Sequence, residues 1–135
     1  IRAVDAAEGR VRWIANLGRA PADGEIVLAA GRVLVTGPDG HLDGFDQTTG
    51  KPVGRVELGG TPQRGLRILG DRAFVQVRRS KTRATPAHDV LLAVSVEPLS
   101  LLWEYVDQGL APGLHGVDGT VIAWPSAAGE VVLFR

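Results

Sequence analysis

Short apolar stretches alternate with turn residues along the whole chain, and helical periodicity is weak throughout. The apolar stretches are rich in Val, Leu and Ile, and they are bounded by Gly, Pro and Asp, which favour turns. This pattern predicts strands over residues 1–5, 10–16, 25–30, 32–37, 41–46, 52–58, 64–69, 71–78, 89–95, 100–106, 112–117, 119–124 and 129–134. We therefore expect an all-β fold.

An eleven-residue unit recurs along the chain. Its copies are residues 3–13, 44–54 and 93–103, and residues 129–134 align with residues 40–45 as the start of a fourth copy. A second element, a turn followed by an apolar run, precedes the later copies at residues 31–36, 70–75 and 118–123. A period near 40 residues with several short strands is typical of β-propeller blades.

The repeat predicts that the whole chain is a single β-propeller segment of about three four-stranded blades. We predict the tail of a blade at 1–16, complete blades at 25–58 and 64–106, and an incomplete blade at 112–135. Three blades do not close a ring, since propellers usually have four to eight. We therefore expect either the remainder of a longer chain, or a second copy that gives a homodimeric ring of six or seven blades. The strand at 129–134 would otherwise be an open edge.

The eleven-residue unit resembles the tryptophan-docking motif of quinoprotein-type, PQQ-like β-propellers, Ala-x-Asp-x-x-Thr-Gly-x-x-x-Trp. That family includes PQQ alcohol dehydrogenases and a PQQ-like lipoprotein of bacterial outer-membrane assembly. The motif residues present are Ala3, Asp5, Gly9 and Trp13 in the first copy, Asp46, Thr49 and Gly50 in the second, and Ala93 and Trp103 in the third. The principal departures are Gly54 at a Trp position and Leu99 at a Gly position.

Each conserved part of the motif has a physical role. Asp and Gly form a tight turn, because Gly adopts positive φ and Asp accepts hydrogen bonds from nearby N–H groups. The resemblance implies that Trp13 and Trp103 dock against the following blade. It also implies a looser joint after the second copy, where Gly54 replaces the Trp.

Composition narrows the possible functions. Lys plus Arg equal Asp plus Glu at 15 each, so the net charge gives no general attraction to nucleic acid or to anionic membranes. No apolar run is long enough to insert directly into a membrane. The absence of Cys excludes disulfides, thiolate metal sites and thiol nucleophiles. The absence of Met leads us to expect that residue 1 is not a native start.

The residues that could carry chemistry in this chain have simpler structural explanations. The resemblance implies that a PQQ site needs a vicinal Cys pair and Asn, Glu and Asp ligands for calcium, whereas this chain has no Cys and only Asn16. The Asp-rich segment 37–46 lacks the spacing of an EF-hand loop, and Asp39-Gly40 favours a hairpin turn. His41, His88 and His115 lie in different blades, and no G-x-S-x-G motif is present. We expect no catalytic residue, no metal and no cofactor.

The most unusual feature is a basic insertion at residues 78–88, between the second and third strands of a blade. It lengthens one repeat interval to 49 residues from 41. It is either a solvated, flexible loop or the contact surface for an anion or an acidic partner. Nucleic acid is disfavoured because the loop has no aromatic residue for base stacking. Under the second alternative, the candidate partner-binding residues are Arg78, Arg79, Lys81 and Arg83.

Together these observations predict a non-catalytic scaffold for protein–protein interaction. The resemblance implies a bacterial protein located outside the cytoplasm, in the periplasm or cell envelope. Two alternatives stay open, namely a fragment of a PQQ-dependent dehydrogenase and a sensor domain of a signalling protein. The sequence does not identify the protein partner.

Overall fold

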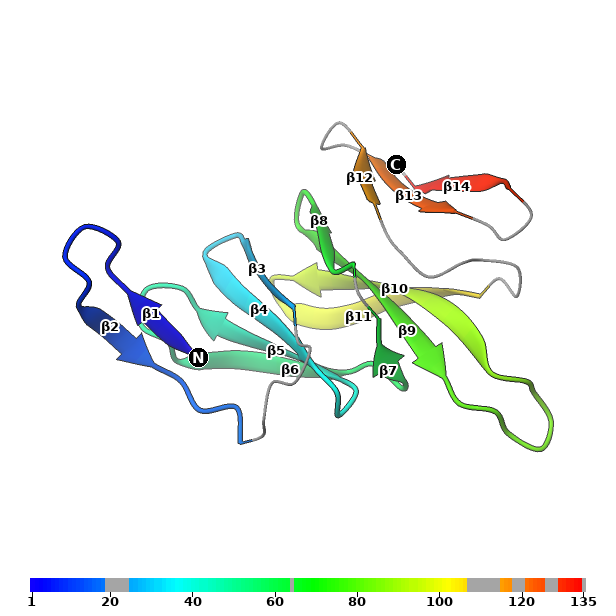
Figure 1. Ribbon diagram of the computed structural model, residues 1–135, viewed down its shortest axis with the longest axis horizontal. Coiled ribbons are helices and arrows are strands. Elements are labelled where there is room, and N and C mark those ends of the chain that lie inside the picture. Colours follow the sequence, from blue (N-terminus) through cyan, green and yellow to red (C-terminus); the bar gives the residue numbers. More distant parts are fainter. Residues whose placement is uncertain (19–24, 64, 107–114, 118–120, 126–128, 135) are drawn as a thin grey trace.

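The computed structural model describes residues 1–18, 25–63, 65–106, 115–117, 121–125 and 129–134, and every regular element in these ranges is a strand (Figure 1). The strands are β1 (Arg2–Val4), β2 (Val11–Ile14), β3 (Ile26–Ala29), β4 (Arg32–Gly37), β5 (His41–Asp46), β6 (Pro52–Glu57), β7 (Thr61–Pro62), β8 (Arg67–Leu69), β9 (Arg72–Arg79), β10 (His88–Val96), β11 (Leu99–Val106), β12 (His115–Val117), β13 (Val121–Pro125) and β14 (Val131–Phe134). The chain is all-β, as its pattern predicts.

The strands form a succession of antiparallel sheets, which we call blades 1 to 4. Blade 1 is β1–β2, blade 2 has the order β3-β4-β5-β6, and blade 4 has the order β12-β13-β14. In blade 3, β9 pairs with β10, which pairs with β11, while β7 and β8 both pair with the other edge of β9. Blade 2 has the four antiparallel strands of a propeller blade, and the succession of such antiparallel sheets makes this chain a segment of a β-propeller.

Each predicted strand corresponds to an observed one, but blade 3 has an additional strand. The pattern predicted one inner strand over residues 64–69, whereas the structure has β7 and β8. Pro62 has no N–H to extend a ladder, and the backbone N–H of Gln63 bonds to the carbonyl of Gln76 instead. Residue 64 and the first residues of the predicted strands 112–117 and 119–124 lie outside the described residues.

The blades share a β-bulge as well as a sequence motif. The register shifts between Ala3 and Val4 in blade 1, between Gly44 and Phe45 in blade 2, and between Ala93 and Val94 in blade 3. These pairs occupy the same position in the three copies of the motif. A bulge bends its strand and increases the local twist, so the repeated bulge gives the outer strands of the blades a similar course.

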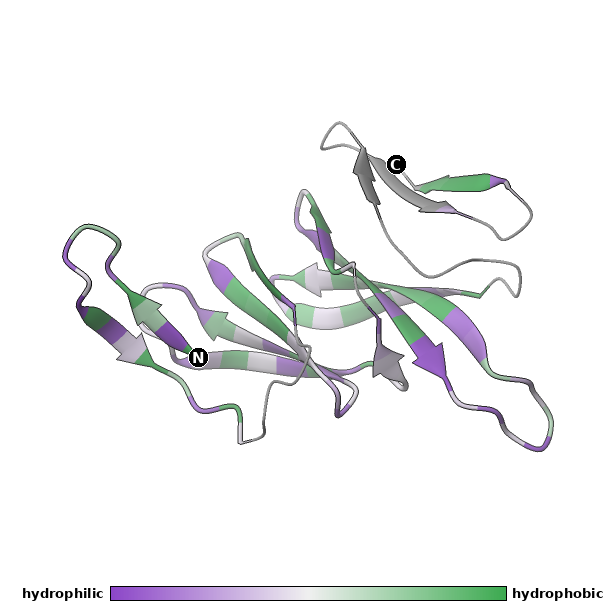
Figure 2. Cartoon of the chain, viewed as in Figure 1, coloured by the Kyte–Doolittle hydropathy of each residue, from purple (hydrophilic) through white to green (hydrophobic). Residues whose placement is uncertain are grey.

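The apolar core lies between blades rather than under one face of a single sheet. Its largest cluster joins blades 2 and 3 and includes Leu34, Leu42, Val75 and Leu92, all with no exposed surface. A second cluster joins blades 1 and 2 through Ala15, Val35 and Phe45. Figure 2 shows the hydrophobic colour concentrated on the strands of blades 2 and 3. Central strands such as β4 and β10 are buried on both faces, which explains their nearly continuous apolar sequence.

Candidate functional site

The motif turn of blade 2 is closed by the carboxylate of Asp46. Its Oδ1 accepts hydrogen bonds from the backbone N–H groups of Thr48 and Thr49, at 3.1 and 2.8 Å, and from the Thr49 hydroxyl at 2.8 Å. Gly50 follows at a φ of 71°, and its N–H bonds to the Asp46 carbonyl at 2.8 Å. The blade 1 turn at residues 5–9 repeats the same backbone bonds, so the first two motif copies share one turn geometry.

The hydrogen bonds around both turn carboxylates favour the ionised form. The pKa of Asp5 lies below its ordinary value, chiefly because the Arg12 side chain donates to it and then because of two backbone N–H groups. The pKa of Asp46 is also lowered, chiefly by the Thr49 hydroxyl and backbone N–H. Both turns are therefore organised around a charged carboxylate at neutral pH.

Trp13 docks on the motif turn of the following blade. Its indole Nε1 donates a hydrogen bond of 3.0 Å to the carbonyl of Gln47. Its ring lies so close to Gly50 that a Cβ there would be 2.5 Å from the ring carbon Cε3. Position 50 therefore requires glycine for two reasons: the backbone has a positive φ, and the indole ring leaves no room for a Cβ.

At the joint between blades 2 and 3, the large side chain and the glycine have changed places relative to the first joint. Gly54 occupies the Trp position of blade 2, and Leu99 occupies the Gly position of blade 3. A Cβ on Gly54 would be 3.2 Å from the Leu99 Cβ, and a Cβ on Gly44 would be 2.9 Å from Leu99 Cδ2. The missing Trp led us to expect a looser joint, but the Leu99 side chain fills the space at this joint. Gly54 and Leu99 each depart from the docking motif, but in different copies of it. Only the contact between the two blades shows that the two departures compensate one another.

Polar links accompany this packing between blades 2 and 3. The Arg32 guanidinium on β4 bonds Glu97 of the next motif turn at 2.8 Å and lies 3.6 Å from Asp46 of its own. Nearer the inner strands, the carboxylate of Glu25 accepts the backbone N–H groups of residues 65 and 66. These links hold both ends of the joint.

The third motif copy is placed differently from the first. Ala93 is fully buried and lies opposite Trp103 in the β10–β11 ladder. The Trp103 ring packs edge-on against Phe74 of the same blade, with centroids 5.9 Å apart. The turn that would follow Phe134 in the next repeat is outside the described residues, so docking of Trp103 on a following blade stays a prediction.

The cations of the basic insertion fall into two pairs: those next to the strands form ion pairs, and those at the tip form none among the described residues. Arg78 lies directly opposite Asp89 in the β9–β10 ladder and bonds its buried carboxylate at 2.7 Å. Arg79 bonds Glu104 of β11 at 2.5 Å. Two of the four candidate partner-binding residues therefore fasten the hairpin to its own blade.

The tip of the insertion is an ordered turn. The Thr82 hydroxyl accepts the N–H groups of residues 84 and 85, and the Thr82 N–H donates to the Thr85 carbonyl at 2.9 Å. Lys81 and Arg83 flank and occupy this turn, and both are exposed. Neither forms an ion pair within the part of the chain that the structure describes. Figure 1 shows the β9–β10 loop extending well beyond the β4–β5 turn.

The Asp-rich segment does not form a convergent ligand set. Asp39 lies 3.2 Å from His41, Asp43 bonds Arg55 at 2.6 Å, and Asp46 closes its turn. Among the described residues, no group of three or more His, Cys, Asp or Glu is arranged to hold a metal ion. The described residues also contain no helix that could span a membrane.

Comparison with known proteins assigns the family. The model of a PQQ-repeat family described as outer membrane protein assembly factor BamB matches residues 1–135. The chain belongs to this BamB-type PQQ-repeat family. A search of curated proteins gives no match.

Two solved structures are similar to this chain. A europium-containing methanol dehydrogenase superposes with a TM-score of 0.57 at 19% identity, over 80% of this chain and 21% of its own. BamB from Moraxella catarrhalis is 20% identical over 98% of this chain and 51% of its own, with a TM-score of 0.40. The chain thus spans about half of that BamB or less than a quarter of the dehydrogenase. The dehydrogenase likeness supports the propeller fold alone.

Acid should weaken the fold through the turn carboxylates. Because the folded pKa of Asp46 is lowered, its stabilising contribution is present above the unfolded pKa of about 3.9 and is lost as the pH falls through the folded value. We expect the urea midpoint to fall between pH 5 and pH 3, and Asp46→Asn to reduce this dependence. Asp5→Asn should do the same. An unchanged pH dependence in both variants would contradict this role.

The size exchange at the second joint predicts energetic coupling. Gly54→Trp should destabilise the chain by about 1–3 kcal/mol through overpacking against Leu99. Leu99→Gly should destabilise it by about 2 kcal/mol through a lost apolar contact. The double variant restores a Trp-on-Gly pair, so its loss should be smaller than the sum by about 1 kcal/mol in urea unfolding. Strictly additive losses would show that the two positions do not dock on one another.

Proposed function

We propose that this chain is a non-catalytic β-propeller scaffold, located outside the cytoplasm, whose β9–β10 hairpin contacts an acidic surface of a protein partner. The observation that carries the proposal is the ordered tip with Lys81 and Arg83 exposed and without an ion partner among the described residues. The hydrogen-bonded backbone of the tip loses less conformational entropy on binding than an unstructured loop would. The exposed cations also attract an acidic partner before contact.

Family membership supports the cellular setting. The matching family carries the description of an outer membrane assembly factor, which favours a role in assembling or holding other proteins in the bacterial envelope. The alternative of a PQQ-dependent dehydrogenase fragment rests on a likeness in fold, and fold alone does not specify function. The sensor-domain alternative has no supporting feature among the contacts described above.

Residue-specific cross-linking tests the contact. A photoreactive benzoylphenylalanine in place of Arg83 should capture one discrete envelope protein in cells, whereas the same substitution at Arg10 should not. Arg10 is a matched control, because it is an exposed arginine in a turn at the other end of the blades. Capture in the cytoplasmic fraction, or equal capture at both positions, would contradict the proposal.

Binding of the captured protein gives the second readout. The variant Lys81→Ser with Arg83→Ser should bind it about fivefold more weakly, since two exposed ion pairs contribute about 0.5 kcal/mol each. The loss should shrink at high salt. Wild-type affinity in this variant would remove the hairpin from the interface.

Self-association is a second proposal about partners, carried by an apolar groove. A groove of about 640 Å³ lies between β1 and blade 2, and its walls include the exposed side chains of Val4, Ile26 and Leu28. β1 holds the same place in the repeat as β5 of blade 2. In blade 2, β4 pairs with the edge of β5 that faces away from β6, and β3 pairs with β4. The occupant that fits is therefore a pair of strands of the same repeat type, which a second copy of the chain contains.

The solution mass tests this second proposal. Light scattering after size exclusion, over a range of concentrations, should give the mass of a dimer. A monomer at every concentration would contradict self-association and leave the hairpin proposal unaffected.

A further inference from the structure

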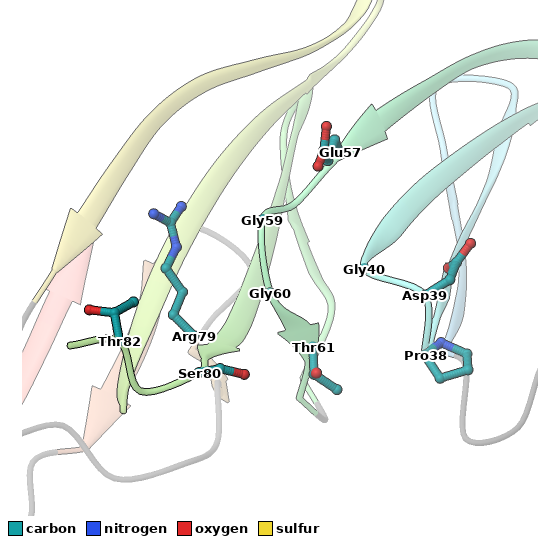
Figure 3. A pocket seen from close by; sticks show the side chains of 10 residues that line it. All are labelled: Pro38, Asp39, Gly40, Glu57, Gly59, Gly60, Thr61, Arg79, Ser80 and Thr82. Atoms are coloured by element: carbon teal, nitrogen blue, oxygen red, sulfur yellow. The ribbon is translucent and has the colours of Figure 1, made fainter. Parts of the chain in front are cut away.

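A polar cleft opens at the end of blades 2 and 3, beside the β9–β10 hairpin. It has a volume of about 460 Å³ and lies where three connections meet: the β4–β5 turn, the β6–β7 connection and the β9–β10 loop. Figure 3 shows Arg79, Ser80 and Thr82 on one side, Asp39 and Glu57 towards the other, and Gly60 and Thr61 between them.

Backbone atoms rather than side chains form the contact between these connections. A Cβ on Gly40 would be 2.8 Å from the carbonyl oxygen of Gly60, and a Cβ on Gly60 would be 2.8 Å from that of Arg78. Glycine at positions 40 and 60 therefore lets blades 2 and 3 approach closely while leaving the space above them open. This requirement is local to the cleft, since neither glycine belongs to the docking motif.

Charges of opposite sign stand at the adjoining hairpin tip and on the far side of the cleft. On the hairpin side, the cation that lines the cleft is Arg79, which is paired with Glu104. Lys81 and Arg83 stand outside the lining, at the adjoining hairpin tip, where both are exposed without an ion pair in the described ranges. On the opposite side, Glu57 lines the cleft, is exposed and has no ion pair among the same residues. Asp39 also lines the cleft, and its carboxylate lies 3.2 Å from His41. The hydroxyls of Thr61 and Ser80 line the space between.

We infer that the cleft binds an extended protein segment that carries an acidic residue at one end and a basic residue at the other. This inference rests on the proposed function and specifies the chemistry of the partner. The acidic end faces the hairpin tip, and the basic end faces Glu57 and Asp39, because like charges placed opposite one another are rejected. A purely acidic segment would meet repulsion on the second side. The lining has no aromatic platform for a nucleobase and little apolar wall for a small cofactor.

Short peptides of defined charge test the inference directly. The probe is a dye-labelled Asp-Asp-Gly-Ser-Gly-Lys-Lys peptide, compared by fluorescence anisotropy with Gly-Ser, all-Asp and all-Lys peptides of the same length. The bipolar peptide should bind more tightly than the other three. Glu57→Lys should weaken its binding about threefold, and Lys81→Glu should do the same, as expected for single exposed ion pairs.

Matched variants at the other end of the blades provide the controls. Asp71→Lys and Lys51→Glu make the same charge changes at exposed positions outside the cleft, and both should leave peptide binding unchanged. Binding of the all-Asp peptide should fall in Lys81→Glu and rise in Glu57→Lys, which separates the two sides.

The outcomes distinguish this inference from the proposed function. If the bipolar peptide binds no better than the Gly-Ser peptide, or if Glu57→Lys has no effect on it, the two-sided cleft is wrong. The hairpin contact would still stand where cross-linking from position 83 and the serine variant support it. If the peptide binding and the cross-linking both fail, the scaffold proposal itself is wrong.

Discussion

The contact on which the rest of this structure depends is a bulky side chain of one blade pressed against a glycine of its neighbour. At the first joint the pair is Trp13 on Gly50, and at the second it is Leu99 on Gly54. Such contacts are needed because β4 and β10 are apolar on both faces and no single blade can bury both. As in other repeat proteins, stability therefore resides largely in the interfaces between neighbours.

The docking contacts also separate the two ends of the blades by role. At the end with the motif turns, neighbouring blades are joined by the Asp46 turn, the Arg32 ion pair and the docked indole of Trp13. The opposite end carries the connections that meet around the cleft and the basic hairpin. Because the joint fixes the blades relative to one another, connections from two different blades can present charges at a set separation. Under the proposed function, the polar groups at this second end contact the partner.

Much of this organisation is predictable from sequence, and the exceptions have physical causes. The strands, the repeat and the Asp–Gly turns follow from local pattern, since alternation, turn residues and period are encoded within each copy. Leu99 was not recognised as a docking residue, because its meaning depends on Gly54 in another blade. Likewise, β7 is too short to leave a pattern. Two of the four cations are paired, because Asp89 lies opposite Arg78 in the β9–β10 ladder and because Glu104, on the next strand β11, reaches Arg79. Both contacts depend on how the strands pair. The cleft requires three connections to converge, which the repeat alone does not indicate.

The most direct test of the docking account is an NMR measurement at the second joint, where the partners are exchanged. With methyl-labelled leucine, we expect nuclear Overhauser effects from the Leu99 methyl groups to the α-protons of Gly44 and Gly54, which face Leu99 at close range. We also expect these methyl groups to be shielded from a soluble paramagnetic probe. Absence of both cross-peaks, with Leu99 methyl groups as accessible as those of the exposed Leu102, would contradict the central claim.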